Sequence, residues 1–145
     1  MKINEDNPIT MLISSIVTPF IMLFGLYVIF HGHYSPGGGF QGGTLLAASI
    51  IIIRLALGSD IGQLQFPSRL GTPLGSLGVL IYFGTGMAAV FFGGRFLDYH
   101  FLPVAVEPFL RRSWGILFVE IGVGLTVMAI LVSIYDDLLG EDSDD

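Results

Sequence analysis

Four long apolar stretches dominate the chain, and short polar segments separate them. The first stretch, residues 9–30, has no ionisable residue over 22 positions, which at about 1.5 Å per helical residue covers the roughly 30 Å hydrocarbon core of a bilayer. Three further stretches follow at residues 40–57, 73–92 and 113–135. This pattern predicts an all-α integral membrane protein with four transmembrane helices and both termini on one side.

The segments between these helices differ in character. Residues 31–43 read HGHYSPGGGFQGG, which predicts a tight turn rich in glycine. Residues 59–72 are polar and predict a loop. Residues 93–112 interleave aromatic with charged residues, a composition typical of a segment at headgroup depth. We expect one membrane domain, residues 1–135, followed by an acidic tail, residues 136–145.

Composition supports the membrane assignment. The chain is 52% hydrophobic and 12% charged, with a mean hydropathy of +0.77, which is too apolar for a soluble domain of this length. The net charge of -6 comes from the C-terminal end. Its six acidic residues are Asp136, Asp137, Glu141, Asp142, Asp144 and Asp145. Such an end is typically solvated, with contact to a partner as the alternative. We expect contacts with lipid and other subunits, and no nucleic-acid partner.

The first residues do not predict a secretory signal, and the basic residues do not fix the orientation of the chain in the membrane. Glu5 and Asp6 precede the first apolar stretch, which is too long for a secretory signal, so we expect residue 1 to remain in the mature chain. The basic residues tie across the membrane: Lys2, Arg54 and Arg69 on one side, Arg95, Arg111 and Arg112 on the other. We place the protein in the cell membrane and prefer cytoplasmic termini.

Small residues mark the helix faces that pack closely. At about 100° per residue, one face of the third helix carries Gly71, Gly75, Gly78, Tyr82, Thr85, Gly86 and Ala89. The fourth helix has two such faces, one with Gly115, Gly122, Thr126, Ala129 and Ser133, and one with Ser113, Glu120 and Gly124. Because neither face suits lipid, we expect other subunits to press on the fourth helix.

Glu120 and Arg54 are the ionisable residues expected inside membrane helices. Glu120 lies about seven residues beyond the expected start at Ser113, some 10 Å below the interface. It is either a proton or cation relay or a structural, hydrogen-bonded carboxyl group. Arg54 shares a face with Gly43 and Ala47 and is expected to snorkel to the membrane surface. A difference in depth of roughly 10 Å makes a direct pair with Glu120 unexpected.

The glycine-dense stretch predicts a turn and a packing element. Ser35, Pro36 and Gly37 to Gly39 favour a turn with unusual φ values, and two GxxxG pairs favour packing against the first helix. These pairs are formed by Gly38, Gly39, Gly42 and Gly43. We expect the turn to form a mouth about 10 Å above Glu120. The spacing of the glycines imitates a dinucleotide fingerprint, but a membrane helix precedes it instead of a strand.

Few other residues offer chemistry. His31 and His33 could pass protons, but two histidines without a nearby carboxylate do not make a metal site. The sequence has no cysteine, which excludes disulfides and clusters bound by its own thiolates. It offers no nucleophile with a base and no cofactor motif. We therefore expect no catalytic residue, no cofactor, no metal, and no enzyme activity of the chain by itself.

At the glycine stretch the chain resembles the B subunit of the Mrp-type, or Mnh-type, multisubunit sodium/proton antiporter. The residues that carry the resemblance are Gly32-His33-Tyr34-Ser35-Pro36-Gly37-Gly38-Gly39-Phe40, followed by Gln41-Gly42-Gly43, and Glu120-Ile121-Gly122-Val123 in the fourth helix. The resemblance extends over most of the chain. Many B subunits carry Asp at the position of Glu120. Similar subunits occur in archaeal membrane-bound hydrogenases and sulfur-reducing relatives.

The resemblance implies a small subunit of an assembly that exchanges sodium ions for protons. In such assemblies the larger subunits carry the proton-relay lysines. This chain has no lysine in its expected helices, so it is not expected to pump alone. The first hypothesis is a transport subunit whose ion-path candidates are Glu120, Arg54 and His33. The alternatives are a subunit in the ion-translocating module of a redox-driven complex, and a scaffold without ion contact.

Overall fold

The structure is a computed structural model that describes residues 7–34 and 36–141, and every regular element in these ranges is helical. The elements are α1 (Pro8–His31), α2 (Gly39–Leu57), α3 (Ser59–Gln65), η1 (Ser68–Leu70), α4 (Gly71–Phe91), η2 (Tyr99–Phe101) and α5 (Pro108–Glu141). Four segments are long and apolar enough to cross a membrane: Pro8–His31, Gly39–Leu57, Ser68–Phe91 and Pro108–Gly140. The predicted all-α fold with four spanning helices is confirmed.

The fourth spanning helix is longer at both ends than predicted. α5 begins at Pro108, where the ring of proline fits the first helical turn. Ser113 is therefore not a cap: its hydroxyl donates to the carbonyl of Phe109, one turn earlier in the same helix, at 3.2 Å. At the other end α5 continues to Glu141, so Asp136 and Asp137 are helical and not part of a tail. Asp142, Asp144 and Asp145 lie outside the described residues.

The prediction of a polar loop at residues 59–72 is also wrong. It contains the short helix α3 and the 3₁₀ turn η1, and α4 already begins at Gly71. Gly58, at φ +90°, turns the chain from α2 into α3. Pro73 lies in the first turn of α4, as expected. The reason for the error is that polar residues between spanning helices can still form helix when one face is buried.

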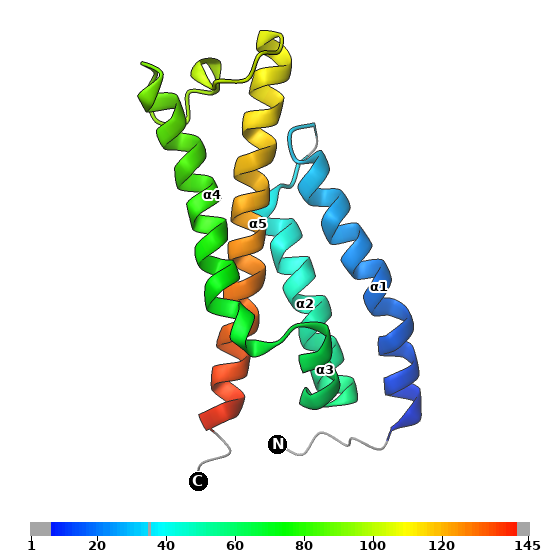
Figure 1. The fold of residues 1–145 in the computed structure, drawn as a ribbon. Coiled ribbons are helices and arrows are strands. Elements are labelled where there is room, and N and C mark those ends of the chain that lie inside the picture. Colours follow the sequence, from blue (N-terminus) through cyan, green and yellow to red (C-terminus); the bar gives the residue numbers. More distant parts are fainter. Residues whose placement is uncertain (1–6, 35, 142–145) are drawn as a thin grey trace.

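α5 is the central helix of the molecule. α4 packs along one side of it, α2 along another, and α1 lies mainly on α2 with a smaller contact to α5 (Figure 1). Within the described ranges no extensive contact joins α4 to α1 or α2. The described chain therefore has α2 and α5 as its inner helices, and α1 and α4 as its outer ones.

Small residues bring the helices together. On α4 the predicted face is confirmed, because Gly71 and Gly78 lie against Ser133 and Thr126 of α5. The Thr126 hydroxyl donates to the carbonyl of Gly75 at 3.1 Å. On the other side of α5, Gly124 lies against Gly43 of α2. The small residues of both faces thus have partners within the chain, so they do not by themselves require another subunit, whereas Glu120 and Ser113 line open cavities.

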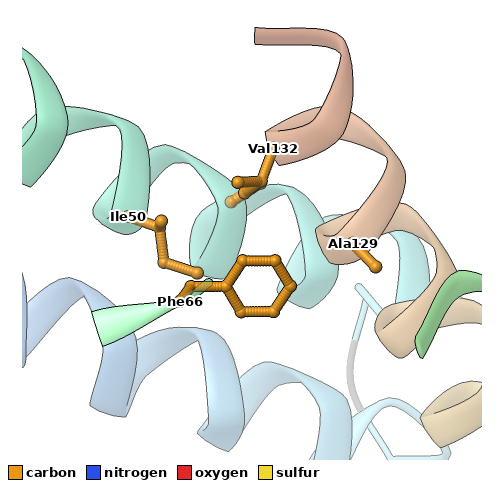
Figure 2. Close-up of a cluster of buried hydrophobic side chains, with 5 residues drawn as sticks. Ile50, Phe66, Ala129 and Val132 are labelled. Carbon is orange, nitrogen blue, oxygen red and sulfur yellow. The ribbon is translucent and has the colours of Figure 1, made fainter. Parts of the chain in front are cut away.

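The apolar core lies where α2, α5 and the end of α3 meet (Figure 2). Its buried members are Ala47, Ile50, Phe66, Ala129 and Val132. Phe66, just beyond α3, closes this core, which explains how a short polar segment is held in place. In contrast, large apolar side chains such as Phe20, Leu80 and Phe91 point outward and are well exposed, as expected for lipid contact.

Candidate functional site beside the glycine turn

The glycine turn, residues 32–38, joins α1 to α2. Gly37 and Gly38 have φ values of +143° and +150°, a backbone conformation that side chains bearing a β-carbon rarely adopt. The predicted need for glycine is therefore confirmed at these two positions. Ser35 of the predicted motif lies outside the described residues, and Pro36 is exposed. Phe40, in the first turn of α2, is 66% exposed.

The glycines at the start of α2 pack in two directions. A β-carbon on Gly42 would meet the Ile29 side chain and lie 2.6 Å from the carbonyl oxygen of Gly25 in α1. A β-carbon on Gly39 would collide with the backbone carbonyl of Glu120 in α5. The predicted close packing against α1 is confirmed, and the same stretch also fixes α2 against α5.

The carboxyl group of Glu120 touches the glycine turn. A β-carbon on Gly32 would overlap this carboxyl group, and one on Gly38 would lie 3.3 Å from its Oε1 atom. The turn and the carboxyl group therefore lie at the same level. The expectation of a mouth about 10 Å above Glu120 is wrong, because the last residues before α2 run down beside α5 instead of staying at the membrane surface.

This level lies inside the membrane. Gly122 of α5 faces the backbone nitrogen of Tyr82, at 3.0 Å from the position of a β-carbon, and α4 continues beyond Tyr82 to Phe91. By helix rise, Glu120 is about 10 Å inside that end of α4. The glycine turn is thus irregular backbone at membrane depth. Such backbone is tolerated only where protein buries it or where it lines a water-filled cavity.

A cleft of about 410 Å³ lies beside the turn. It is lined by Gly37, Gly38, Gly39, Phe40, Gln41 and Glu120. Glu120 is half-buried, and its Oε2 atom is buried without a hydrogen-bond partner among the described residues. Buried polar atoms are nearly always paired, and an intramembrane carboxylate needs a cation, water or a polar neighbour. The cleft therefore offers a carboxyl group with unused acceptor capacity.

Tyr99 is a neighbour of Glu120 that the sequence did not single out. It belongs to η2 and packs on Gly115 of α5, where a β-carbon would collide with its ring. Burial raises the pKa of Tyr99, and the nearby Tyr82 and Glu120 raise it further. The positive charge of Arg112 has the opposite, smaller effect on this pKa. The phenol therefore stays protonated in the physiological range. In the sequence Tyr99 is one of several aromatic residues in the segment 93–112, and nothing there distinguishes it as a neighbour of Glu120.

His33 lies on another side of the turn. Its ring packs against Tyr34 with a centroid distance of 4.1 Å, and its Nδ1 atom is buried without a hydrogen-bond partner in the described chain. It lines a separate cavity of about 210 Å³ with Trp114 and Leu117 of α5. The Nδ1 atom of His31 instead donates a hydrogen bond to the Tyr27 carbonyl, at 3.1 Å. Within residues 7–34 and 36–141, no three His, Asp or Glu side chains form a metal-binding group.

Arg54 lies far from Glu120. It is 3% exposed, forms an ion pair with Asp136, and donates to the Phe66 carbonyl at 2.5 Å. Asp136 also accepts from the Ser68 hydroxyl at 2.7 Å. The expected snorkelling is therefore wrong, since a carboxylate is available within the protein. Sixteen residues of α5, or about 24 Å by helix rise, separate Asp136 from Glu120, so these two charged sites are distinct.

Together these features define a multi-pass helical membrane protein with a carboxyl-bearing cleft inside the bilayer. A sequence profile described as a domain related to the MnhB subunit of Na⁺/H⁺ antiporter matches residues 9–133. A protein of Staphylococcus aureus (strain Newman), provisionally named antiporter subunit mnhB2, is 31% identical over 137 residues, covering 88% of this chain and 95% of its own. The chain belongs to the MnhB family.

Two longer proteins are also similar. An uncharacterized protein of Methanocaldococcus jannaschii is 34% identical over 130 residues, covering 86% of this chain and 49% of its own. A chain in the structure of the membrane-bound sulfane sulfur reductase, an archaeal respiratory membrane complex, is 26% identical with a TM-score of 0.73, covering 96% of this chain and 60% of that one. This chain thus spans about half of the length of the first relative and 60% of the second.

Proposed function

We propose that this chain is a subunit of a multisubunit sodium/proton antiporter module in a cell membrane, and that Glu120 forms part of its ion path. The transported species are sodium ions and protons, and the chain by itself is not an enzyme. Family membership supports the class of assembly. We retain cytoplasmic termini and contacts with other subunits and with lipid as parts of this proposal.

The observation that carries the proposal is the unpaired carboxyl group of Glu120 beside irregular backbone at membrane depth. Hydrocarbon would not tolerate either feature, so water, ions or a polar neighbour must face the cleft. A carboxylate binds sodium by charge and is able to exchange it for a proton. The glycine turn lets backbone approach this carboxylate without side chains blocking the cleft.

His33 and Arg54 have different places in this proposal. His33 lines the neighbouring cavity towards the start of α5, so it is a candidate for passing protons towards the membrane surface. The Arg54 guanidinium group forms an ion pair with Asp136 and donates to the Phe66 carbonyl, near the other end of α5. We therefore assign Arg54 a role in holding the helices, and keep Glu120 and His33 as ion-path candidates.

The competing function is a scaffold in which Glu120 only hydrogen-bonds to a neighbouring subunit. The substitution Glu120→Gln separates the two, because glutamine keeps the size and hydrogen-bonding capacity but can neither carry charge nor release a proton. We expect a Glu120→Gln complex with unchanged subunit composition and lost sodium-coupled proton exchange. Unchanged exchange would establish the scaffold and exclude the ion-path role.

A second candidate function is favoured by the likeness to a chain of an archaeal respiratory membrane complex. There the same kind of subunit would serve an antiporter-like module that a redox reaction drives. Subunit masses in the assembly purified from native membranes distinguish the two hosts. Antiporter-type subunits alone indicate a stand-alone exchanger, whereas co-purifying subunits with redox cofactors indicate a driven pump.

A further inference from the structure

A second polar cavity lies where the connection between α4 and α5 meets the start of α5, and it shares no lining residue with the Glu120 cleft, although its Tyr99 is a neighbour of Glu120. Its volume is about 400 Å³, and its lining includes Arg95, Asp98, Tyr99, His100 and Arg112. The residues come from the connection between α4 and α5 and from the second turn of α5. In Figure 1 this connection lies at the end of the molecule opposite to the start of α1 and the end of α5.

The arginines at this end have different roles. Arg111 donates to the carbonyl oxygens of His100, Val104 and Val106 at 2.9, 3.1 and 3.2 Å, so its guanidinium group holds the connection together. The side chains of Arg95 and Arg112 are exposed and make no hydrogen bond or ion pair within the described chain. Both line the cavity. Two guanidinium groups without an anion thus face the same space.

The acidic residue of the cavity does not neutralise them both. The Asp98 carboxylate accepts from the backbone nitrogen of His100 at 3.3 Å, which caps η2. Two arginines and one aspartate give the lining a net positive charge before His100 is counted. Arginine binds phosphate through paired hydrogen bonds, and this geometry is more specific than that of a lysine ammonium group.

The backbone of the cavity is strained. Leu97 has a φ of +63° and is the one residue other than glycine with positive φ in the described ranges. A branched side chain in this region costs free energy, and such strain collects at functional sites. The turn is nevertheless held, because the nitrogen of Asp98 donates to the carbonyl of Arg95 at 2.9 Å. This turn places Arg95 and Asp98 at the same cavity.

Exposed aromatic side chains gather at the same end of the molecule as the cavity. Phe92, Phe96, Phe101, Phe109 and Trp114 are all between 43% and 68% exposed, and Phe96 is the one among them that lines the cavity. α4 has 21 residues, which span about 30 Å, so a cavity just beyond Phe91 lies at the edge of the hydrocarbon core. Exposed aromatic residues beside cations at this depth are typical of contact with phospholipid headgroups.

We propose that this cavity binds the phosphate group of an anionic phospholipid, with Arg95 and Arg112 as its ligands. The exposed aromatic residues would lie along the glycerol and upper acyl chains of the same lipid. A free phosphate ion shares the headgroup chemistry but makes no use of these apolar neighbours. The proposal is independent of the role of Glu120, because none of its steps involves the Glu120 cleft.

The test uses the complete assembly, delipidated and returned to vesicles of phosphatidylcholine with phosphatidylglycerol. Lipids retained after extraction into detergent are identified by mass spectrometry. Arg95→Gln, Arg112→Gln and the double variant are compared with Arg69→Gln, a matched control at the opposite end of the molecule that is also an exposed arginine. We expect the double variant to retain about tenfold less phosphatidylglycerol, and the control to retain the native amount.

Several results would overturn the proposal. Equal retention of phosphatidylglycerol by the native protein and the double variant excludes the two arginines as ligands. Displacement of the lipid by inorganic phosphate at low concentration assigns the site to a free anion instead. Loss of a neighbouring subunit from the double variant, with lipid retention unchanged, shows that a carboxylate of that subunit occupies the cavity. The single variants decide the question if the double variant fails to assemble.

Discussion

Gly39 at the start of α2 lies directly against the backbone carbonyl of Glu120 in the middle of α5. This contact sets the level of the glycine turn in the membrane and holds the Glu120 side chain beside the turn, where both line the cleft. Any side chain at position 39 has to push α2 away from α5. The position of the candidate ion site therefore depends on a glycine that carries no chemistry itself.

We predict that Gly39→Ala destabilises the protein by about 1–3 kcal/mol, because the methyl group overpacks a contact between two backbones. The matched control is Gly84→Ala on α4, where nothing lies within 4 Å of an added β-carbon. Thermal unfolding of the purified complex in detergent measures both. The midpoint should fall for Gly39→Ala and stay the same or rise for Gly84→Ala. Equal midpoints would show that α2 and α5 separate without cost.

The Arg54–Asp136 ion pair gives a second prediction. Asp136→Ala leaves the Arg54 charge buried without its partner, which should cost about 3 kcal/mol. Asp137→Ala is the control, because Asp137 is its exposed neighbour and should change stability by less than about 0.5 kcal/mol. The double variant Arg54→Leu/Asp136→Leu should be more stable than Asp136→Ala. A double variant as unstable as the single one contradicts a buried pair.

Thr126 provides a test of the packing between α4 and α5. Its hydroxyl donates to the carbonyl of Gly75 across the two helices at 3.1 Å and to the carbonyl of Gly122 in its own helix at 3.0 Å. Thr126→Val keeps the shape and removes both contacts, so we expect a loss of about 0.5–1 kcal/mol, mainly from the interhelical one. Thr44→Val is the control, since the Thr44 hydroxyl is exposed and donates only to the Phe40 carbonyl of its own helix. Equal effects in an unfolding assay would mean that the interhelical bond contributes nothing.

The sequence predicted the spanning helices well, because their apolar runs are long and their packing faces consist of small residues. The face of α4 with Gly71, Gly75 and Gly78 follows directly from a period of 3.6 residues. The turn at Gly37 and Gly38 was predictable for a related reason. A cluster of glycines next to a proline has few other structural explanations.

The ends of the helices and the depths of particular residues in the membrane were not predictable in the same way. Polar residues at 59–65 and 136–141 form helix here because Phe66 and Asp136 have partners distant in sequence, the apolar core and Arg54. Such contacts leave no periodic signal. For the same reason the glycine turn was expected above Glu120. Only the packing of Gly39 and Gly43 on α5 shows that the turn lies beside it.

The most direct test of the central claim is sodium-driven proton movement across vesicles that contain the complete assembly with Glu120→Gln. Glu107→Gln is the matched control, because Glu107 is an exposed glutamate outside the spanning helices. With equal subunit content in all vesicles, the account predicts exchange at the native rate for Glu107→Gln and no sodium-coupled exchange for Glu120→Gln. Native exchange in the Glu120→Gln vesicles would contradict a place for this carboxyl group in the ion path.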